Sequence, residues 1–360
     1  MRIKFYFRPN IKSTRIVKLY FKLLLALTGF SVLNCGGGND ETTPNGSNEI
    51  VANFSVSSTI INQGESIQIS NQTTGSVTHW NWTFEGGSPA TSTERHPTVT
   101  YSEPGEYTIS LKARNANDQT EATKTENIRV KEIIEPPYAG TIFIDANIIT
   151  ADDPTIYEKI EAKGTGTRTM FDRRVNNWIE VEAHLFEVTF QGKVVEAQVN
   201  PEFTAEAALN HATKYAEIIG RMPKVLFKDL NTIWIHDGNN PFGGGNNNLL
   251  IHIGQALDYE AAGIIEEVFI HEAAHTSLDA DHAQSEGWAA AQKEDPTYIS
   301  TYARDNNIRE DVAESFLPYL AVKFKSERLS EEMINTIRNA MPSRIVYFDG
   351  QNFDFAPWGN

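Results

Sequence analysis

The chain has 360 residues, which is longer than one typical domain, and 40% of them are hydrophobic and 10% aromatic. This composition supplies enough apolar side chains for folded cores, so it excludes a wholly disordered chain. The formal net charge of −16 argues against nucleic acid as a partner, because an acidic surface repels phosphate groups. The sequence therefore predicts two folded units with appended segments.

The first 34 residues differ from the rest of the chain. They contain seven Lys and Arg residues, no acidic residue, and an apolar run over residues 23–33. This run is too short for a stable transmembrane helix but fits the hydrophobic region of a signal peptide. We therefore expect residues 1–34 to be a lipoprotein signal peptide.

The single cysteine, Cys35, follows this segment directly and occupies the place of the lipidated cysteine in bacterial lipoproteins. The preceding Val32-Leu33-Asn34 departs from the small residues usual there, and plain secretion is the alternative. Because there is no second cysteine, no intramolecular disulfide can form. The sequence predicts an exported lipoprotein of the outer membrane or cell surface, held to the membrane only through Cys35, or otherwise a secreted protein.

Residues 35–49 are rich in Gly, Asn and Thr and predict a flexible linker. Residues 50–132 predict an all-β unit, because short alternating runs are separated by turn signals such as Gly86-Gly87 and Pro104-Gly105. The expected strands cover residues 51–56, 66–70, 79–84, 98–101, 107–113 and 125–130.

Two motifs within residues 50–132 resemble the PKD family of immunoglobulin-like sandwiches. The first is WNWTFEGG, beginning at Trp80, and the second is YSEPGEY, beginning at Tyr101. The resemblance implies that alternate aromatic side chains enter the core and that the Pro-Gly pair makes a turn before a long strand. It also implies a spacer or binding module, with its aromatic residues serving the core.

Residues 133–140, which include Pro136-Pro137, predict a stiff hinge, and residues 141–360 predict a mixed α+β unit. Apolar residues at helical spacing predict three helices, and apolar runs between them predict strands. We expect strands over 141–149, 178–199, 230–236 and 249–253, helices over 204–220, 262–278 and 309–324, and a Gly/Asn-rich loop over 242–248.

The strongest chemical signal is HEAAH, from His271 to His275. Two histidines four residues apart share one helical face, so both imidazoles can bind one metal ion. Glu272 lies beside the first histidine and can accept a proton from a zinc-bound water. The motif predicts a zinc site in which His271 and His275 are ligands and Glu272 is the catalytic base.

Zinc needs a third protein ligand, and the residues leave alternatives open. Asp281 lies six residues after His275, with His282 beside it, but Leu278 stands where a glycine would let the chain turn back. Glu310 and Glu314 lie on one face of a predicted helix. One of these glutamates could bind zinc while the other orients a histidine.

The arrangement of HEAAH and the second glutamate helix resembles the gluzincin zinc peptidases. STYAR from Ser300, followed by EDVAESF from Glu310, is similar to the active-site region of the anthrax lethal factor type of catalytic domain. The resemblance implies a zincin-like metallopeptidase fold for residues 141–360. It also implies that Glu310 is the third ligand, that Glu314 supports a histidine, and that Tyr302 stabilises the oxyanion.

Three further features of residues 141–360 are the segment before the motif helix, two other histidines and a basic segment. In this class of peptidase the strand before the motif helix, here within residues 246–253, forms the upper edge of the cleft, and residues 243–245 then predict a mobile rim. His236 and His252 are expected to be structural. Arg168, Arg173 and Arg174 form a basic segment that could meet a substrate carboxylate or pair internally.

The sequence therefore predicts a secreted or surface-anchored zinc metallopeptidase that hydrolyses peptide bonds in peptide or protein substrates. The alternative is an adhesive or polymer-binding surface lipoprotein whose peptidase-like domain does not cut. The glutamate of the HEAAH motif favours the enzyme, because a binding module needs no base beside a metal.

Overall fold

The computed structural model describes residues 49–116, 121–144 and 148–359. The predicted signal peptide, Cys35 and all of the predicted linker except Glu49 lie outside these ranges. Within the described ranges, every helix is too short or too polar to cross a lipid bilayer.

The described residues before position 132 form a β-sandwich, which confirms the predicted fold of this part. One sheet has the strand order β1-β3-β6 and the other the order β2-β8-β7-β4-β5. All six predicted strands form, whereas β2 and β5 were not predicted because two or three residues are too few to show alternation. The strands are β1 (Phe54–Val56), β2 (Ile60–Asn62), β3 (Ser66–Asn71), β4 (His79–Phe84), β5 (Thr91–Ser92), β6 (Thr98–Thr100), β7 (Gly105–Arg114) and β8 (Glu121–Lys131).

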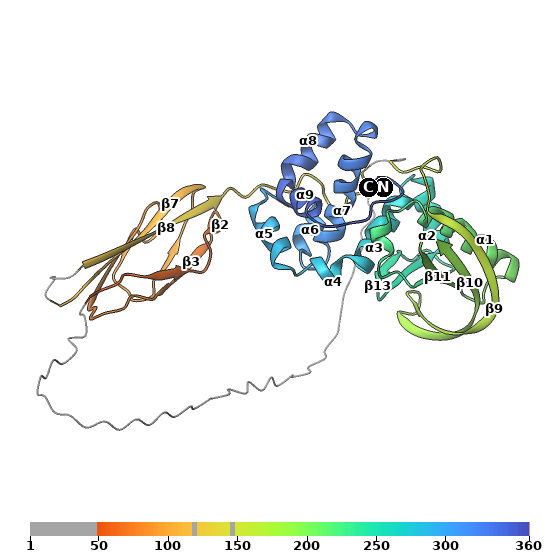
Figure 1. Ribbon diagram of the computed structural model, residues 1–360, viewed down its shortest axis with the longest axis horizontal. Helices are drawn as coiled ribbons and strands as arrows, with labels where there is room; N and C mark the ends of the chain where they lie inside the picture. The colour runs from red at the N-terminus through yellow and green to blue at the C-terminus, as the bar shows by residue number, and fades with distance from the viewer. Residues whose placement is uncertain (1–48, 117–120, 145–147, 360) are drawn as a thin grey trace, which may run out of the picture. The chain divides into compact units, whose positions relative to one another are not determined.

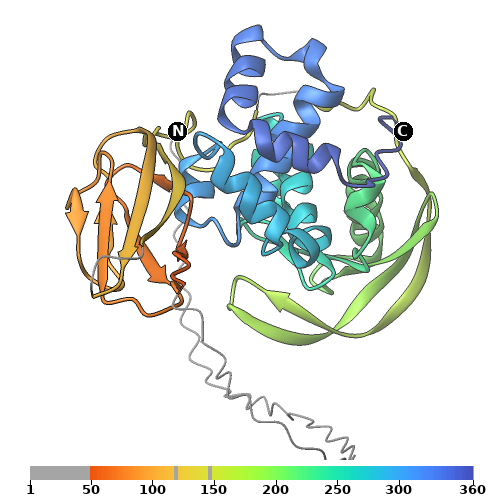
Figure 2. The same ribbon diagram turned by 60° about the vertical axis from the view of Figure 1, so that its left-hand side comes forward.

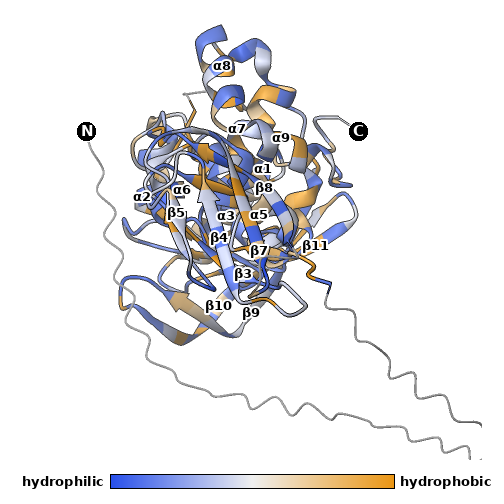
Figure 3. Cartoon of the chain, turned by 90° about the vertical axis from the view of Figure 1, so that its left-hand side faces the viewer, coloured by the Kyte–Doolittle hydropathy of each residue, from blue (hydrophilic) through white to orange (hydrophobic). Residues whose placement is uncertain are grey.

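Alternation of apolar and polar residues gives the longer sandwich strands a buried face, and Figure 3 shows this alternation along β7. Trp82 and Phe84 of β4 are buried as predicted, and the Trp82 indole donates a hydrogen bond of 2.9 Å to the Glu94 carbonyl. Gly86 has a φ of +66°, and a Cβ there would lie 2.2 Å from the Tyr107 ring. The turn after β4 therefore requires glycine.

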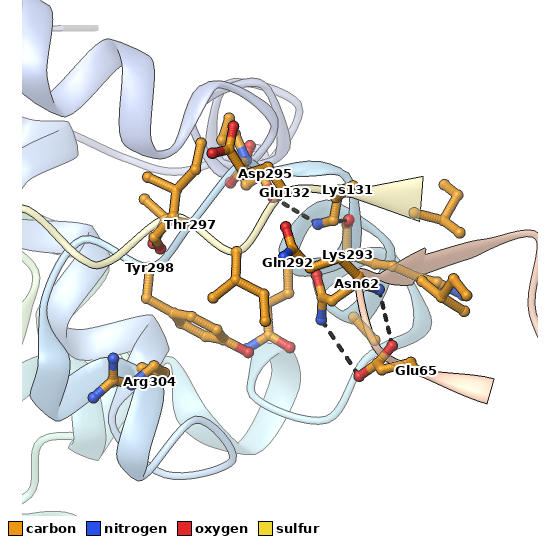
Figure 4. Close-up of a pocket in the computed structure, with 17 residues that line it drawn as sticks. Asn62, Glu65, Lys131, Glu132, Gln292, Lys293, Asp295, Thr297, Tyr298 and Arg304 are labelled. Atoms are coloured by element: carbon orange, nitrogen blue, oxygen red, sulfur yellow. Dashed lines mark hydrogen bonds between the residues drawn. The ribbon is translucent and has the colours of Figure 1, made fainter. Parts of the chain in front are cut away.

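The turn between β2 and β3 is closed by a carboxylate. Glu65 accepts hydrogen bonds from the backbone N–H of Asn62, at 2.9 Å, and from its side-chain amide, at 3.4 Å (Figure 4). A side chain that satisfies a turn's backbone donor replaces the missing strand partner there.

The later part of the chain contains a six-stranded sheet of order β13-β14-β12-β11-β10-β9. The pairs β11-β12 and β12-β14 are parallel and the others are antiparallel. Figures 1 and 2 show β9 and β10 as a long, curved hairpin. The strands are β9 (Tyr157–Asp172), β10 (Asn177–Phe190), β11 (Lys193–Val199), β12 (Thr232–His236), β13 (Gly243–Gly245) and β14 (Asn248–His252).

Helices accompany this sheet, so the predicted mixed unit is confirmed at the level of a helix and sheet region. The three predicted helices form as α1, α3 and α7, each within about three residues of its expected ends. The helices are α1 (Ala205–Ile219), α2 (Ile253–Ala261), α3 (Ile265–Ser277), α4 (Asp279–His282), α5 (Glu286–Glu294), α6 (Thr301–Asp305), α7 (Asp311–Phe324), α8 (Glu331–Ala340) and α9 (Pro342–Asp349), with 3₁₀ turns η1 (Lys224–Phe227) and η2 (Ser326–Arg328).

Two strand predictions in this part were wrong. The described residues of 141–149 form no strand, because the backbone N–H groups of Ile142 and Ile144 donate to the buried carboxylates of Glu314 and Glu267. Residues 178–199 form the hairpin of β10 and β11 in place of one strand. The partner strand β9 was missed because most of its side chains are exposed and polar.

The edge of the sheet also differs from the prediction. Residues 248–252 form the inner strand β14, and the glycines expected in a mobile rim form the edge strand β13. A Cβ on Gly244 would lie 1.7 Å from the carbonyl oxygen of Glu272, so only glycine permits this approach to α3. The Gly245 N–H donates to the Thr276 hydroxyl at 2.8 Å, which fixes β13 against α3.

We predict that Gly244→Ala lowers the free energy of unfolding by about 2 kcal/mol, because the added methyl group forces β13 away from α3. Urea denaturation of the full chain measures this loss. Gly350→Ala is the matched control, since its Cβ would lie 3.4 Å from the nearest atom, the Tyr347 carbonyl oxygen. Equal stability of the two variants would contradict the close approach of β13 to α3.

Candidate metal centre

Helix α3 positions the HEAAH motif. Val268, Phe269 and Ile270 are buried, which fixes the helix in the core, and one face of the helix packs against α7. His271 and His275 lie one turn apart on that face, with 3.2 Å between their Nε2 atoms. The helical spacing therefore brings the two imidazoles together as expected.

Helix α7 supplies the third group. Glu310 stands directly before the first residue of α7, and its Oε2 lies 3.0 Å from His275 Nε2 and 3.6 Å from His271 Nε2. Three donors bound tetrahedrally to one zinc ion, each about 2.0–2.1 Å from it, lie about 3.3 Å apart. The spacing and the N/N/O donor set fit such an ion. Within the described residues, this is the single group of three or more His, Cys, Asp or Glu donors with such convergence.

Carboxylates also contact the outer nitrogens of the two histidines. Asp279 Oδ2 lies 2.8 Å from His275 Nδ1, and Glu314 Oε1 lies 3.5 Å from His271 Nδ1. Glu314 is itself held by the Ile142 N–H and the Ser300 hydroxyl. Such partners fix the ring orientation of metal-binding histidines. The role of Asp279 was missed, although its position four residues after His275 is the signal that could have revealed it.

The electrostatics of the cluster favour a positive charge. Burial alone lowers the pKa of His275, but hydrogen bonds to Asp279 and Glu310 outweigh it and raise the pKa to about 10. Burial raises the pKa of Glu314 to about 7, against the opposing effects of His271 and Ser300. A cation bound by His271 and His275 would have the side chains of Glu310, Asp279 and Glu314 around it.

The other two predicted catalytic residues lie beside this cluster. Glu272 is a partly exposed residue of α3, next to His271. Tyr302 comes from α6, and burial together with the neighbouring charge of Glu310 and a hydrogen bond to it raises the pKa of the tyrosine hydroxyl. The structure thus brings Tyr302 to Glu310 although eight positions separate them.

The alternative third ligands lie elsewhere. Asp281 of α4 is exposed, and its carboxylate pairs with Lys228. His282 donates or accepts a hydrogen bond of 2.7 Å with the Tyr347 hydroxyl. Neither belongs to the group formed by His271, His275 and Glu310.

The basic segment lies in the last part of β9 and in the turn that joins β9 to β10. Arg168 forms a bidentate ion pair with Glu196, and Arg174 pairs with Asp172 and Glu202, as internal pairing predicts. The guanidinium of Arg173 lies close to Gly243 of β13.

His236 and His252 are fully buried at the ends of β12 and β14, with their ring centroids 5.6 Å apart. Burial lowers the pKa of each to about 4. Asp172 opposes this lowering for both residues, and Arg174 adds to it. The expected structural role of both residues stays a prediction.

Residues 51–127 match the PKD domain family. Similar solved structures include the PKD1 domain of the Vibrio cholerae metalloprotease PrtV, at 27% identity and a TM-score of 0.20, covering 23% of this chain and 96% of that one. The PKD1 domain of Vibrio anguillarum Epp is 25% identical, with a TM-score of 0.20, covering 23% and 93%. No curated protein matches the chain. The match to the family model identifies residues 51–127 as a PKD domain.

We predict that His236 and His252 together lower the free energy of unfolding as the pH falls from about 6.5 to about 4. The unfolded chain binds protons at His236 and His252 below pH 6.5, whereas the folded chain binds them only near pH 4. Each histidine then removes at most about 1.4 kcal/mol per pH unit in this window. Urea denaturation at pH 7.5, 6 and 5 measures the slope.

His252→Gln should reduce that slope, because glutamine takes up no proton in this range. The exposed His79→Gln in β4 is the control and should keep the slope of the unchanged chain. An identical slope in the His252→Gln variant would contradict the assignment.

Proposed function

We propose that residues 141–360 form a zinc-dependent peptidase of gluzincin type that hydrolyses peptide bonds. The observation that carries this proposal is the convergence of His271, His275 and Glu310 from two helices, with Glu272 beside them. This donor set fits zinc better than Mg²⁺ or Ca²⁺, which prefer oxygen ligands.

His271, His275 and Glu310 would hold the ion, and Asp279 and Glu314 would orient the two imidazoles. Zinc at this position would supply a Lewis acid and lower the pKa of a coordinated water to about 7. Three protein donors converge among the described residues, and a zinc ion held by them would have a position left for water or substrate.

The remaining chemistry belongs to the protein's own side chains. Glu272 takes the proton from the attacking water and passes it to the nitrogen of the leaving amine. The Tyr302 hydroxyl donates a hydrogen bond to the carbonyl oxygen as negative charge develops there. A tyrosine hydroxyl is protonated at neutral pH, and the raised pKa of Tyr302 leaves this unchanged, so the donor is present.

The edge strand β13 would orient the substrate. It lies directly against the carbonyl of Glu272, so a peptide that adds to this edge passes close to the catalytic carboxylate. We further propose that the enzyme acts outside the cytoplasm, as a lipoprotein or a secreted protein. Support for this part comes from the sequence of residues 1–35.

We predict that Glu272→Gln lowers kcat/KM at least about a thousandfold while the zinc content stays unchanged, because the amide cannot take the proton. Mass spectrometry of a mixed peptide library measures the cleavage rate. Glu286→Gln, an exposed change at the start of α5, is the control. Full cleavage by zinc-loaded Glu272→Gln would contradict the mechanism.

The third ligand has its own test. Glu310→Ala should weaken zinc binding more than about 100-fold, since it removes a direct ligand. Asp281→Ala should leave the affinity unchanged, because Asp281 pairs with Lys228 at the surface. Competition with a chromophoric chelator measures both, and the reverse result would make Asp281 the ligand.

A further inference from the structure

The edge strand β13 has an unusual sequence for a substrate-binding edge, because all three of its residues are glycine. It pairs with β14 on one side, and within the described residues it is the last strand of the sheet on the other. A peptide that pairs with this edge would meet no side chains of β13 itself. Any selectivity on this strand must come from groups that other elements bring to it.

Arg173 is such a group. The curved β9–β10 hairpin, visible in Figure 2, begins in the strand farthest from β13, yet the residue after β9 reaches the opposite edge of the sheet. An ideal Cβ on Gly243 would lie 2.5 Å from Nη2 of Arg173 and 3.3 Å from its Cζ. The guanidinium therefore occupies the space that a side chain at position 243 would fill.

The two faces of β13 have different neighbours. A Cβ on Gly244 would point at the Glu272 carbonyl, and one on Gly243 at Arg173. Successive residues of a strand face opposite sides of the sheet, so Arg173 covers the face away from α3. A substrate residue paired with Gly243 directs its side chain to that same face.

We infer that Arg173 is a specificity residue that selects aspartate or glutamate at the substrate position paired with Gly243. This inference rests on the proposed function. A guanidinium presents parallel N–H donors that match a carboxylate. Here the guanidinium occupies the place of a side chain at position 243, which is the neighbour that the paired substrate side chain would meet. The overall charge of −16 disfavours acidic peptides, so a local arginine is needed to bind one.

Peptide binding tests the inference without turnover. The full chain with Glu272→Gln, loaded with zinc, is titrated into fluorescein-labelled peptides of Ala and Ser that carry Glu, Gln or Lys at one position. At one position the Glu peptide should bind about tenfold more tightly than the Gln peptide, as a partly shielded ion pair would give. Fluorescence anisotropy measures the affinities.

Substitutions at Arg173 should change only this preference. Adding Arg173→Ala should remove the tenfold difference, and adding Arg173→Glu should reverse it in favour of Lys at the same position, which a misfolded protein cannot do. Arg168→Ala is the matched control from the same hairpin, since its guanidinium is paired with Glu196. It should keep the preference for Glu.

The outcomes separate this inference from the proposed function. Equal binding of the three peptides, no binding of any peptide, or a Glu preference that survives Arg173→Glu would overturn the role of Arg173. Cleavage by the unchanged enzyme without acidic preference would do the same while supporting the peptidase. If acid-selective binding depends on Arg173 but the unchanged, zinc-loaded chain cleaves no peptide, the role of Arg173 is supported and the peptidase is contradicted.

Discussion

The contact between α3 and α7 brings His271 and His275 to Glu310, and much of the surrounding structure stabilises that contact. Arg344 is fully buried and pairs with Asp311 at 2.9 Å and with Asp295 at 3.1 Å, which fixes the first turn of α7 beside Glu310. Glu314 is anchored to the Ile142 N–H. Buried charges are costly unless they are paired, so these networks hold the helix in one position.

The second constraint is the close approach of β13 to α3. It requires glycine at position 244, and the Thr276 hydroxyl links α3 to β13 by accepting from the Gly245 N–H and to β14 by donating to the Asn248 carbonyl. The same lack of side chains that lets β13 reach the motif helix also makes room for Arg173 on its other face. The proposed catalytic and substrate-binding geometry thus depends on one short strand.

Local patterns predicted the helices and the pair of histidines, because helical spacing alone decides which of these residues share a face. They could not choose between Glu310 and Asp281, since that choice depends on how α3 packs against α7. The strand predicted at 141–149 was wrong for the same reason, because tertiary contacts decide the structure there. The backbone N–H groups of this segment bind Glu267 and Glu314, which come from distant helices. The glycines of β13 suggested a mobile rim in the sequence. The contact with Glu272 that fixes them is tertiary, so the local sequence could not reveal it.

The metal content of the purified full chain, after zinc is offered and excess removed, tests the central claim most directly. The account predicts one zinc ion per chain in the unchanged protein and none in a folded variant carrying His271→Ala and His275→Ala. A folded, unchanged chain that retains no zinc, or a double variant that retains as much as the unchanged chain, would contradict it.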